Sequence, residues 1–231
     1  MRLLLVGRGR MGRLIESLAG GYGAEVAGIL DRASNAKGAG VTAERCRGID
    51  VAIDFSTAEA TLDSVPRLAA HGVSLVVGTT GWLAREAELR DAVARAGIGA
   101  VVAANFSLGA NVLEALAESA GRLLAGADSY GAFIHEAHHS AKKDAPSGTA
   151  LRLRKAVERG GFPRAIDVSS TRAGFIPGTH TVGFDAQAET LALTHTVRDR
   201  ATFAHGALAA ARWVQGRKGW FTMRDVLGLT G

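Results

Sequence analysis

Residues 3–12 read Leu3-Leu4-Leu5-Val6-Gly7-Arg8-Gly9-Arg10-Met11-Gly12, and this stretch decides the fold of the first half of the chain. Its four consecutive apolar residues predict a short buried strand, and the pattern from Met11 to Leu18 predicts a helix directly after it. The three glycines have the spacing G-x-G-x-x-G, which lets a backbone approach a pyrophosphate while the helix N-terminus offers free N–H groups. We therefore take Gly7, Arg8, Gly9, Arg10, Met11 and Gly12 as candidate cofactor-binding residues.

The residues up to about 105 continue the same alternation of strand and helix. Short apolar runs at 25–30, 51–53, 75–77 and 100–103 predict four more strands, and 58–70 and 83–95 predict helices. Buried strands separated by crossover-length helices are typical of a parallel sheet covered on both faces. The sequence thus predicts an α/β fold that begins with a Rossmann-like parallel sheet.

The choice between the two nicotinamide dinucleotides depends on the residues after the second predicted strand. Asp31 stands about twenty residues after the glycine loop, where an acidic residue binds the ribose hydroxyls of NADH. Arg32 follows it, and a nearby arginine accommodates the 2′-phosphate of NADPH. We expect NADH, NADPH or both to be used.

Two further loops follow the fourth and fifth predicted strands. Ligands of open α/β sheets collect at the carboxyl ends of the strands, so both loops are candidates for the nicotinamide side of the cofactor. Ordinary connecting loops are the alternative for each loop taken alone. The candidate residues are Gly78, Thr79 and Thr80 in the first loop and Ala103, Ala104, Asn105 and Phe106 in the second.

The second half has a different pattern. Helices are predicted at 109–124, 151–157 and 201–213, and strands at 130–134, 166–172, 180–184 and 190–197. These strands alternate with turn residues and suggest a mixed or antiparallel sheet. We expect residues 1–105 plus 201–231 to form the dinucleotide-binding domain, and residues 106–200 a smaller α+β domain for substrate binding and oligomerisation.

The segment 136–149 reads Glu-Ala-His-His-Ser-Ala-Lys-Lys-Asp-Ala-Pro-Ser-Gly-Thr and concentrates titratable groups. His138 and Lys142 are suited to proton delivery, because histidine titrates near neutrality and lysine becomes acidic enough when buried. Asp144 to Thr149 is predicted to open a helix, with Pro146 in its first turn and Asp144 or Ser147 as the cap. The N–H groups of Gly148 and Thr149 would then bind a carboxylate-sized anion.

Two other interpretations of this segment were weighed. Adjacent histidines seldom point the same way, and no further ligand stands at a spacing such as H-x-x-x-H, so a metal site is not favoured. A solvated charge cluster is the other alternative, and the dinucleotide motif elsewhere in the chain weakens it.

Composition excludes several classes. The 231 residues carry a net charge of +5, but the arginines are spread along the chain and no basic run predicts nucleic-acid binding. No apolar stretch reaches the roughly 20 residues of a membrane helix, and no signal peptide is recognised. A single cysteine, Cys46, forms no intramolecular disulfide. We expect a cytoplasmic enzyme.

The 136–149 segment, together with Asp54-Phe55-Ser56, Gly78 to Gly81, Ala104 to Ser107 and Phe203 to Ala207, resembles the bacterial 4-hydroxy-tetrahydrodipicolinate (dihydrodipicolinate) reductase family of lysine and diaminopimelate biosynthesis. The resemblance implies NAD(P)H-dependent reduction of a cyclic dicarboxylate, and a homotetramer built through the sheets of the substrate domain. It assigns general acid/base chemistry to His138 and proton donation to Lys142. It assigns substrate-carboxylate contacts to His139, Gly148 and Thr149.

Departures from the family pattern concern other parts of the chain. The chain is shorter than most members, and the segment between Arg32 and Val51 leaves little room for a full crossover helix. Two rival functions stay open. One is another two-domain amino-acid oxidoreductase, of the aspartate or homoserine dehydrogenase type, and the other is a non-catalytic dinucleotide sensor.

Overall fold

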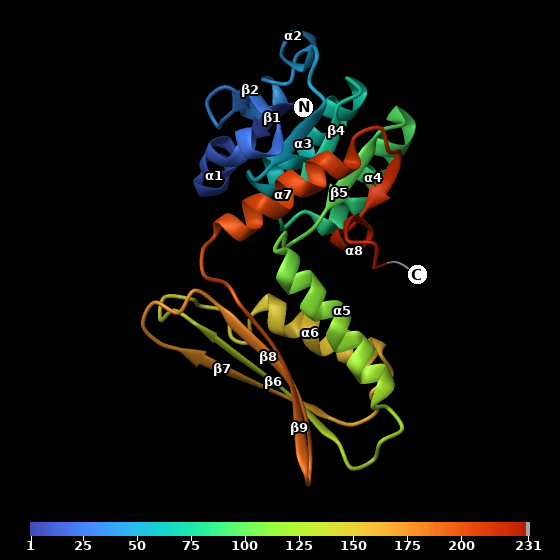
Figure 1. The fold of residues 1–231 in the computed structure, drawn as a ribbon. Coiled ribbons are helices and arrows are strands. Elements are labelled where there is room, and N and C mark those ends of the chain that lie inside the picture. Colours follow the sequence, from blue (N-terminus) through green and yellow to red (C-terminus); the bar gives the residue numbers. More distant parts are fainter. Residues whose placement is uncertain (230–231) are drawn as a thin grey trace. The chain divides into compact units, whose positions relative to one another are not determined.

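The computed structural model describes residues 1–229 and divides into two compact units. One unit contains residues 1–108 together with the segment from Ala201 onward, and the other contains Gly109–Arg200. Each unit has its own sheet and its own core, and each is described by itself below (Figure 1).

The first unit is built on a six-stranded sheet in the order β10-β5-β4-β3-β1-β2, in which every neighbouring pair is parallel. Its strands are β1 (Arg2–Val6), β2 (Glu25–Leu30), β3 (Val51–Asp54), β4 (Ser74–Val77), β5 (Gly99–Val102) and β10 (Gly219–Phe221). Its helices are α1 (Arg10–Leu18), η1 (Ala19–Tyr22), η2 (Ala36–Gly38), α2 (Ala43–Cys46), α3 (Ala58–Ala70), η3 (Leu83–Arg85), α4 (Glu86–Ala96), α7 (Ala201–Val214) and α8 (Met223–Val226).

Apolar layers on both faces hold this sheet in place. Side chains of α1 and α7 pack with Leu3 and Leu5 on one face, and side chains of α3 and α4 pack with Leu4 and Val6 on the other. Successive residues of a strand point to opposite faces, so the continuous apolar run of β1 serves both layers. The strand order reverses between β1 and β3, and ligands of such sheets bind at this switch point, beyond the carboxyl ends of the strands.

The second unit is a four-stranded mixed sheet in the order β7-β6-β8-β9, where β6 pairs in parallel with β7 and the other pairs are antiparallel. Helices α5 and α6 cover one face of this sheet (Figure 1). The elements are α5 (Leu108–Leu123), β6 (Gly131–His138), α6 (Gly148–Arg159), β7 (Ile166–Arg172), β8 (Thr179–Ala186) and β9 (Glu189–Thr196).

The prediction of a parallel sheet followed by a smaller mixed sheet is confirmed. The short connection before Val51 is confirmed too, since it contains only η2 and the four-residue α2. Strand β10 and helix α8 at residues 219–226 were not predicted, because each is too short for a periodic pattern.

Two predictions about the 130–149 region were wrong. The strand does not stop at Ile134 but continues to His138, because the buried Glu136 has charged partners that allow a polar residue on the covered face. Helix α6 begins at Gly148 with Ser147 alone as its cap, so Pro146 precedes the cap and does not lie in the first turn. Among the described residues, no helix is long and apolar enough to cross a membrane.

Candidate active site

The glycine loop lines a cavity of about 580 Å³ at the switch point of the first unit. The loop supplies Gly7, Arg8 and Gly9, and the chain after β2 supplies Asp31 and Arg32. The other lining residues come from the ends of β1 and β2, from the segment that includes η2, from the β3–α3 turn and from the first half of α3. Five of the predicted cofactor residues therefore surround one cavity.

The three glycines of the motif are required for different reasons. Gly7 has φ +101° and its Cβ would lie 2.4 Å from the Phe55 carbonyl oxygen, while a Cβ on Gly12 would lie 2.2 Å from the Gly7 carbonyl oxygen. These two are fixed by the backbone and by close packing of α1. A Cβ on Gly9 would meet no atom of its own unit within 4 Å, and its φ of −73° suits any residue. The chain itself gives no reason for glycine at position 9, which agrees with the approach of a ligand phosphate.

Asp31 lines the cavity, and one of its carboxylate oxygens is bound by the neighbouring chain. Its Oδ1 accepts hydrogen bonds from Ala33 N, Ser34 N and Ser34 Oγ at 3.1, 2.9 and 2.8 Å. Hydrogen bonds from Ser34 lower the pKa of Asp31, with a smaller contribution from Arg8. The residue is therefore ionised at neutral pH and fixed at the cavity wall.

Lys37 is a cavity residue that the sequence analysis missed. It lines the same cavity as Asp31 and Arg32, within η2. It is also the one non-glycine residue of the described chain with a positive φ, +51°. Such strained residues cluster at ligand sites. Its position in an irregular connection left no sequence pattern to find it.

The two loops predicted for the nicotinamide side lie close to residues at the end of β3. Thr79 Oγ1 donates to Asp54 Oδ1 at 2.9 Å and accepts from Ser56 N at 2.8 Å, and Ser56 lines the cavity. Asp54 is 1% exposed, and burial raises its pKa, partly offset by hydrogen bonds from Ser56, Thr61 and Thr79. Asp54 thus ties the loop after β4 to the cavity wall.

The remaining predicted cofactor residues do not line the cavity. Phe106 has its side chain in the core, 1% exposed and edge-on to Phe55 at 5.8 Å between ring centres. It could therefore offer a ligand only its backbone. The predicted residues outside the cavity lining are Arg10, Met11, Gly12, Gly78, Thr79, Thr80, Ala103, Ala104, Asn105 and Phe106.

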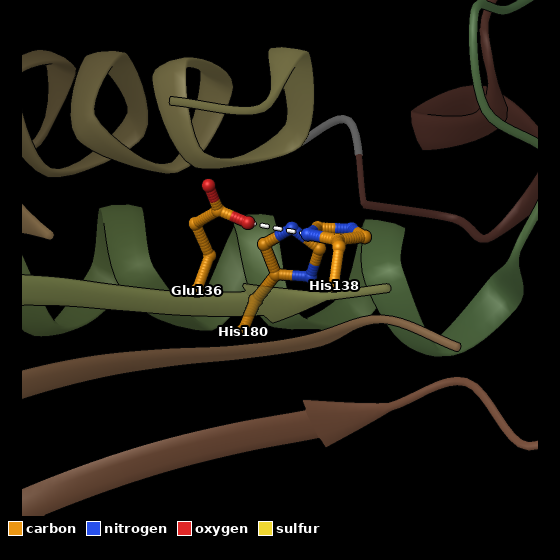
Figure 2. A group of neighbouring side chains, drawn as sticks. All are labelled: Glu136, His138 and His180. Carbon is orange, nitrogen blue, oxygen red and sulfur yellow. Dashed lines mark hydrogen bonds and ion pairs between the residues drawn. The ribbon is translucent and has the colours of Figure 1, made fainter. Parts of the chain in front are cut away.

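In the second unit, Glu136 and His138 lie two positions apart on β6 and therefore on the same face (Figure 2). His138 Nδ1 makes a very short hydrogen bond with Glu136 Oε2. Glu136 is fully buried. Burial lowers the pKa of His138, Glu136 raises it, and Lys142 and Arg172 lower it further. The net effect is a lowered pKa, so a protonated His138 is a stronger acid than free imidazole.

Arg172, at the end of β7, neutralises Glu136. Its Nη2 donates to Glu136 Oε1 at 2.6 Å and its Nη1 donates to Oε2 at 3.0 Å. Burial alone raises the pKa of Glu136, but hydrogen bonds from Arg172, Ser170 and His138 outweigh it and lower the pKa to about 2. Arg172 Nη2 also donates to the Asp144 carbonyl oxygen at 2.6 Å, which connects this pair to the loop that carries Lys142.

Lys142 and the start of α6 already surround a carboxylate, that of Asp144. Lys142 Nζ lies 2.7 and 2.9 Å from the two Asp144 oxygens. The hydrogen bond from Lys142 lowers the pKa of Asp144 most, and the backbone N–H of Gly148 contributes to the same shift. A Cβ on Gly148 would meet no atom of its own unit within 4 Å. This corner therefore accommodates a carboxylate and leaves room beside Gly148.

Ser147 and His180 complete the network beneath His138. Ser147 Oγ accepts from Ala150 N at 3.2 Å as the α6 cap and lies 3.0 Å from His180 Nε2. The His180 ring stands edge-on to His138, 5.0 Å between centres (Figure 2). Burial lowers the pKa of His180 to about 4, so it is neutral at pH 7. His139 and Thr149 are half-buried, the first directly after β6 and the second in the first turn of α6.

The network also groups three possible metal ligands. One atom from each of Glu136, His138 and His180 lies within 4.8 Å of the others. The sequence analysis tested only the two adjacent histidines and did not see this grouping. Both Glu136 oxygens already accept hydrogen bonds from Arg172, so a cation there would face a guanidinium. The contacts favour an acid–base network over a metal centre.

Glu136 had a signal in the sequence that was not used, whereas Arg172 and His180 had none. The i, i+2 spacing of Glu136 and His138 places both on one face of a strand, but the strand was predicted to end at Ile134. Arg172 and His180 are distant in sequence and reach the site only through the pairing of β6 with β7 and β8. Sequence spacing alone could not have assigned these two residues.

Comparisons with known proteins agree with this arrangement. Residues 1–106 match the family model "Dihydrodipicolinate reductase, N-terminus", and residues 109–227 match "Dihydrodipicolinate reductase, C-terminus". A 4-hydroxy-tetrahydrodipicolinate reductase of Thiobacillus denitrificans is 40% identical, over 96% of this chain and 96% of its own length. A 4-hydroxy-tetrahydrodipicolinate reductase of Laribacter hongkongensis is 38% identical, over 99% of this chain and 98% of its own length.

A solved structure shares the fold. The dipicolinate-bound dihydrodipicolinate reductase of Paenisporosarcina sp. TG-14 superposes with a TM-score of 0.79 at 21% identity, covering 96% of this chain and 97% of that one. Both family models and both full-length relatives lead to one assignment. The chain belongs to the dihydrodipicolinate reductase family.

Proposed function

We propose that this protein catalyses the NAD(P)H-dependent reduction of 4-hydroxy-tetrahydrodipicolinate, or of its dehydrated form, to tetrahydrodipicolinate in lysine biosynthesis. The observation that carries the proposal is the juxtaposition of His138, Lys142 and the α6 N-terminus around a carboxylate-sized corner. The other unit has the glycine-loop cavity, whose open space at Gly9 suits a dinucleotide phosphate. Full-length relatives named 4-hydroxy-tetrahydrodipicolinate reductase support the same reaction.

The residues of the second unit would bind the dicarboxylate and supply a proton. A bound reduced nicotinamide supplies the hydride. Lys142 and the N–H groups of Gly148 and Thr149 hold one substrate carboxylate where Asp144 lies now, and His139 is a further contact. Lys142 or His138 then protonates the ring as negative charge develops on it, and the cationic surroundings stabilise that charge.

One assay separates this function from its two rivals. Oxidation of NADH and NADPH is followed with three substrates: the freshly made product of dihydrodipicolinate synthase, aspartate semialdehyde, and oxaloacetate with ammonia. We expect turnover with the first alone. Turnover with either of the others would assign a homoserine or aspartate dehydrogenase, and none with any of them, despite cofactor binding, would assign a sensor.

We further propose that the enzyme accepts both dinucleotides. Asp31 favours the free ribose hydroxyls of NADH, whereas Arg32 and Lys37 add positive charge to the same cavity for a 2′-phosphate. The Asp31→Ala variant should raise KM for NADH about 10-fold or more while leaving KM for NADPH within about 3-fold, because hydrogen bonds to a charged group contribute roughly 1.5–3 kcal/mol. Steady-state kinetics with both cofactors measure this.

The matched control removes a different carboxylate from the same cavity. Asp63 lines the cavity but does not follow β2, so Asp63→Ala should leave the ratio of the two KM values near that of the unmodified enzyme. An Asp31→Ala enzyme with an unchanged ratio would show that the ribose binds elsewhere.

A homotetramer formed through the sheet of the second unit is also proposed. Helices α5 and α6 cover only one face of this sheet (Figure 1). Uncharged hydroxyl groups form the middle of the other face: Thr179 pairs with Thr196 at 3.1 Å and Thr181 with Thr194 at 2.9 Å. This hydroxyl-lined part of the face suits the same part of a second copy.

Introducing a charge on this face should break the assembly. For Thr181→Arg we expect the mass in solution to fall from about four times 23.9 kDa to that of a smaller species, measured by light scattering after gel filtration. Gln187→Arg adds the same charge in the exposed β8–β9 turn and should leave the mass unchanged. An intact tetramer in the Thr181→Arg variant would place the interface on another surface.

A further inference from the structure

Glu136 is the most completely buried ionised group of the second unit, and the proposed chemistry gives it no direct role. It is 0% exposed, and each of its oxygens accepts at least two hydrogen bonds. Oε2 binds His138 Nδ1 and Arg172 Nη1, and Oε1 binds Arg172 Nη2 and, at 3.3 Å, Ser147 N. An unpaired buried carboxylate would be strongly destabilising, so this arrangement requires all of its partners.

We propose that Glu136, held ionised by Arg172, is a positioning residue that fixes the proton of neutral His138 on Nδ1 and directs Nε2 to the substrate. The inference rests on the proposed function only for the statement that His138 exchanges a proton with substrate. A carboxylate cannot donate, so the nitrogen that binds it must carry hydrogen. Nε2 is then the one nitrogen of neutral His138 that can accept a proton or, once protonated, give it away.

The surroundings of Nε2 agree with this orientation. Gly178, at the start of β8, has φ +137°, and a Cβ there would lie 3.1 Å from His138 Nε2. Glycine at this position therefore leaves the nitrogen uncrowded. The ring packs edge-on against His180, with 5.0 Å between ring centres. Nε2, which Gly178 leaves uncrowded, is the nitrogen that Glu136 does not bind.

Arg172 keeps Glu136 ionised and links it to the loop that carries Lys142. With the guanidinium in place, Glu136 stays ionised through the pH range of the reaction, and the same guanidinium binds the carbonyl of Asp144 beside Lys142. The charged groups that face His138 are Glu136 on β6, Arg172 on β7 and Lys142 in the following loop, with the neutral His180 on β8. Of these, Glu136 alone favours the protonated imidazole.

The test uses Glu136→Gln, which has the same shape but no charge. Nitrogen-15 NMR of the histidine rings reports the tautomer of His138 in the ligand-free enzyme, without any need for activity. In the unmodified enzyme we expect the proton on Nδ1, and in Glu136→Gln a loss of this preference. We also expect kcat to fall about 100-fold or more, with the limb of the pH–rate profile that reports His138 moved to lower pH, because Glu136 raises the pKa of His138, while KM for NADH changes little.

The test needs a control substitution and a second variant that still folds if Glu136→Gln does not. Glu189→Gln makes the same substitution at the far end of the sheet, and should change neither tautomer nor profile. If Glu136→Gln fails to fold, Arg172→Lys keeps the charge but loses the two-pronged contact, and should weaken the tautomer preference. A proton on Nε2 in the unmodified enzyme, or an unchanged pH profile in Glu136→Gln, would overturn the inference. Absence of reductase activity in an enzyme with the expected tautomer would instead count against the proposed function.

Discussion

Replacing Lys142 with alanine should lower kcat by about two to four orders of magnitude, the range typical of losing a positioned acid. The structure places this ammonium within hydrogen-bonding distance of a carboxylate, and close enough to His138 to lower its pKa. Its loss removes a proton donor and a charge that stabilises the developing anion. KM for NAD(P)H should change modestly, because Lys142 lies in the unit without the glycine loop.

Lys143 is the matched control for this experiment. It is the next residue, carries the same charge and is exposed, so Lys143→Ala tests for a general loss of positive charge. We expect near-wild-type kinetics from it. Asp144→Asn shows what the ion pair with Asp144 contributes, because it removes the partner charge and leaves the Lys142 ammonium in place. A Lys142→Ala enzyme with near-wild-type kcat would contradict the assignment.

Much of the fold could be predicted from the sequence because its signals are local. The run from Leu3 to Gly12 encodes strand, turn and helix within ten residues, and the structure reproduces all three. Glycine at position 12 is explained by its contact with Gly7 inside the same stretch, whereas glycine at position 7 is explained by its positive φ and by the approach of the Phe55 carbonyl. Asp31 was predicted from its distance along the sequence from that motif. The structure brings it to the same cavity because β2 lies beside β1.

The site could be predicted only in part because its central interaction is not local. His138, Lys142 and Gly148 lie within one segment, so their density was visible in the sequence. Arg172 reaches Glu136 through the parallel pairing of β6 with β7, which no periodic pattern specifies. The buried Glu136 also interrupts the apolar alternation of the strand. The predicted strand therefore ended at Ile134, before the carboxylate that binds His138.

Removing Arg172 should produce the largest loss of stability among these variants. Breaking a buried ion pair from one side costs about 3–5 kcal/mol, because the remaining charge stays buried and unpaired. For Arg172→Ala we expect a loss of about 3 kcal/mol in the second unit. All three tryptophans, Trp82, Trp213 and Trp220, lie in the first unit, so hydrogen exchange of the β6–β8 amides is the suitable measurement.

Arg154→Ala provides the control, since Arg154 pairs with Glu158 at 2.8 Å on the exposed face of α6. Exposed pairs of this kind contribute at most about 0.5 kcal/mol. If Arg172→Ala lost no more stability than Arg154→Ala, Glu136 would have to be solvated or otherwise paired. Adding Glu136→Gln to Arg172→Ala should recover part of the stability, because the unpaired charge is then gone.

The pH dependence of this loss identifies its cause. The pKa of Glu136 is about 2 in the folded protein, below the roughly 4.3 of an unfolded chain. A depressed pKa contributes stability that is complete above about pH 4.3 and is lost as the pH falls toward 2. Without Arg172, burial dominates and the folded pKa rises, so the variant gains relative stability on acidification. The difference in unfolding free energy between the unmodified protein and Arg172→Ala should therefore become smaller from pH 7 to pH 3. A difference independent of pH would mean that Arg172 stabilises the sheet by packing alone, and that Glu136 does not depend on it for its charge.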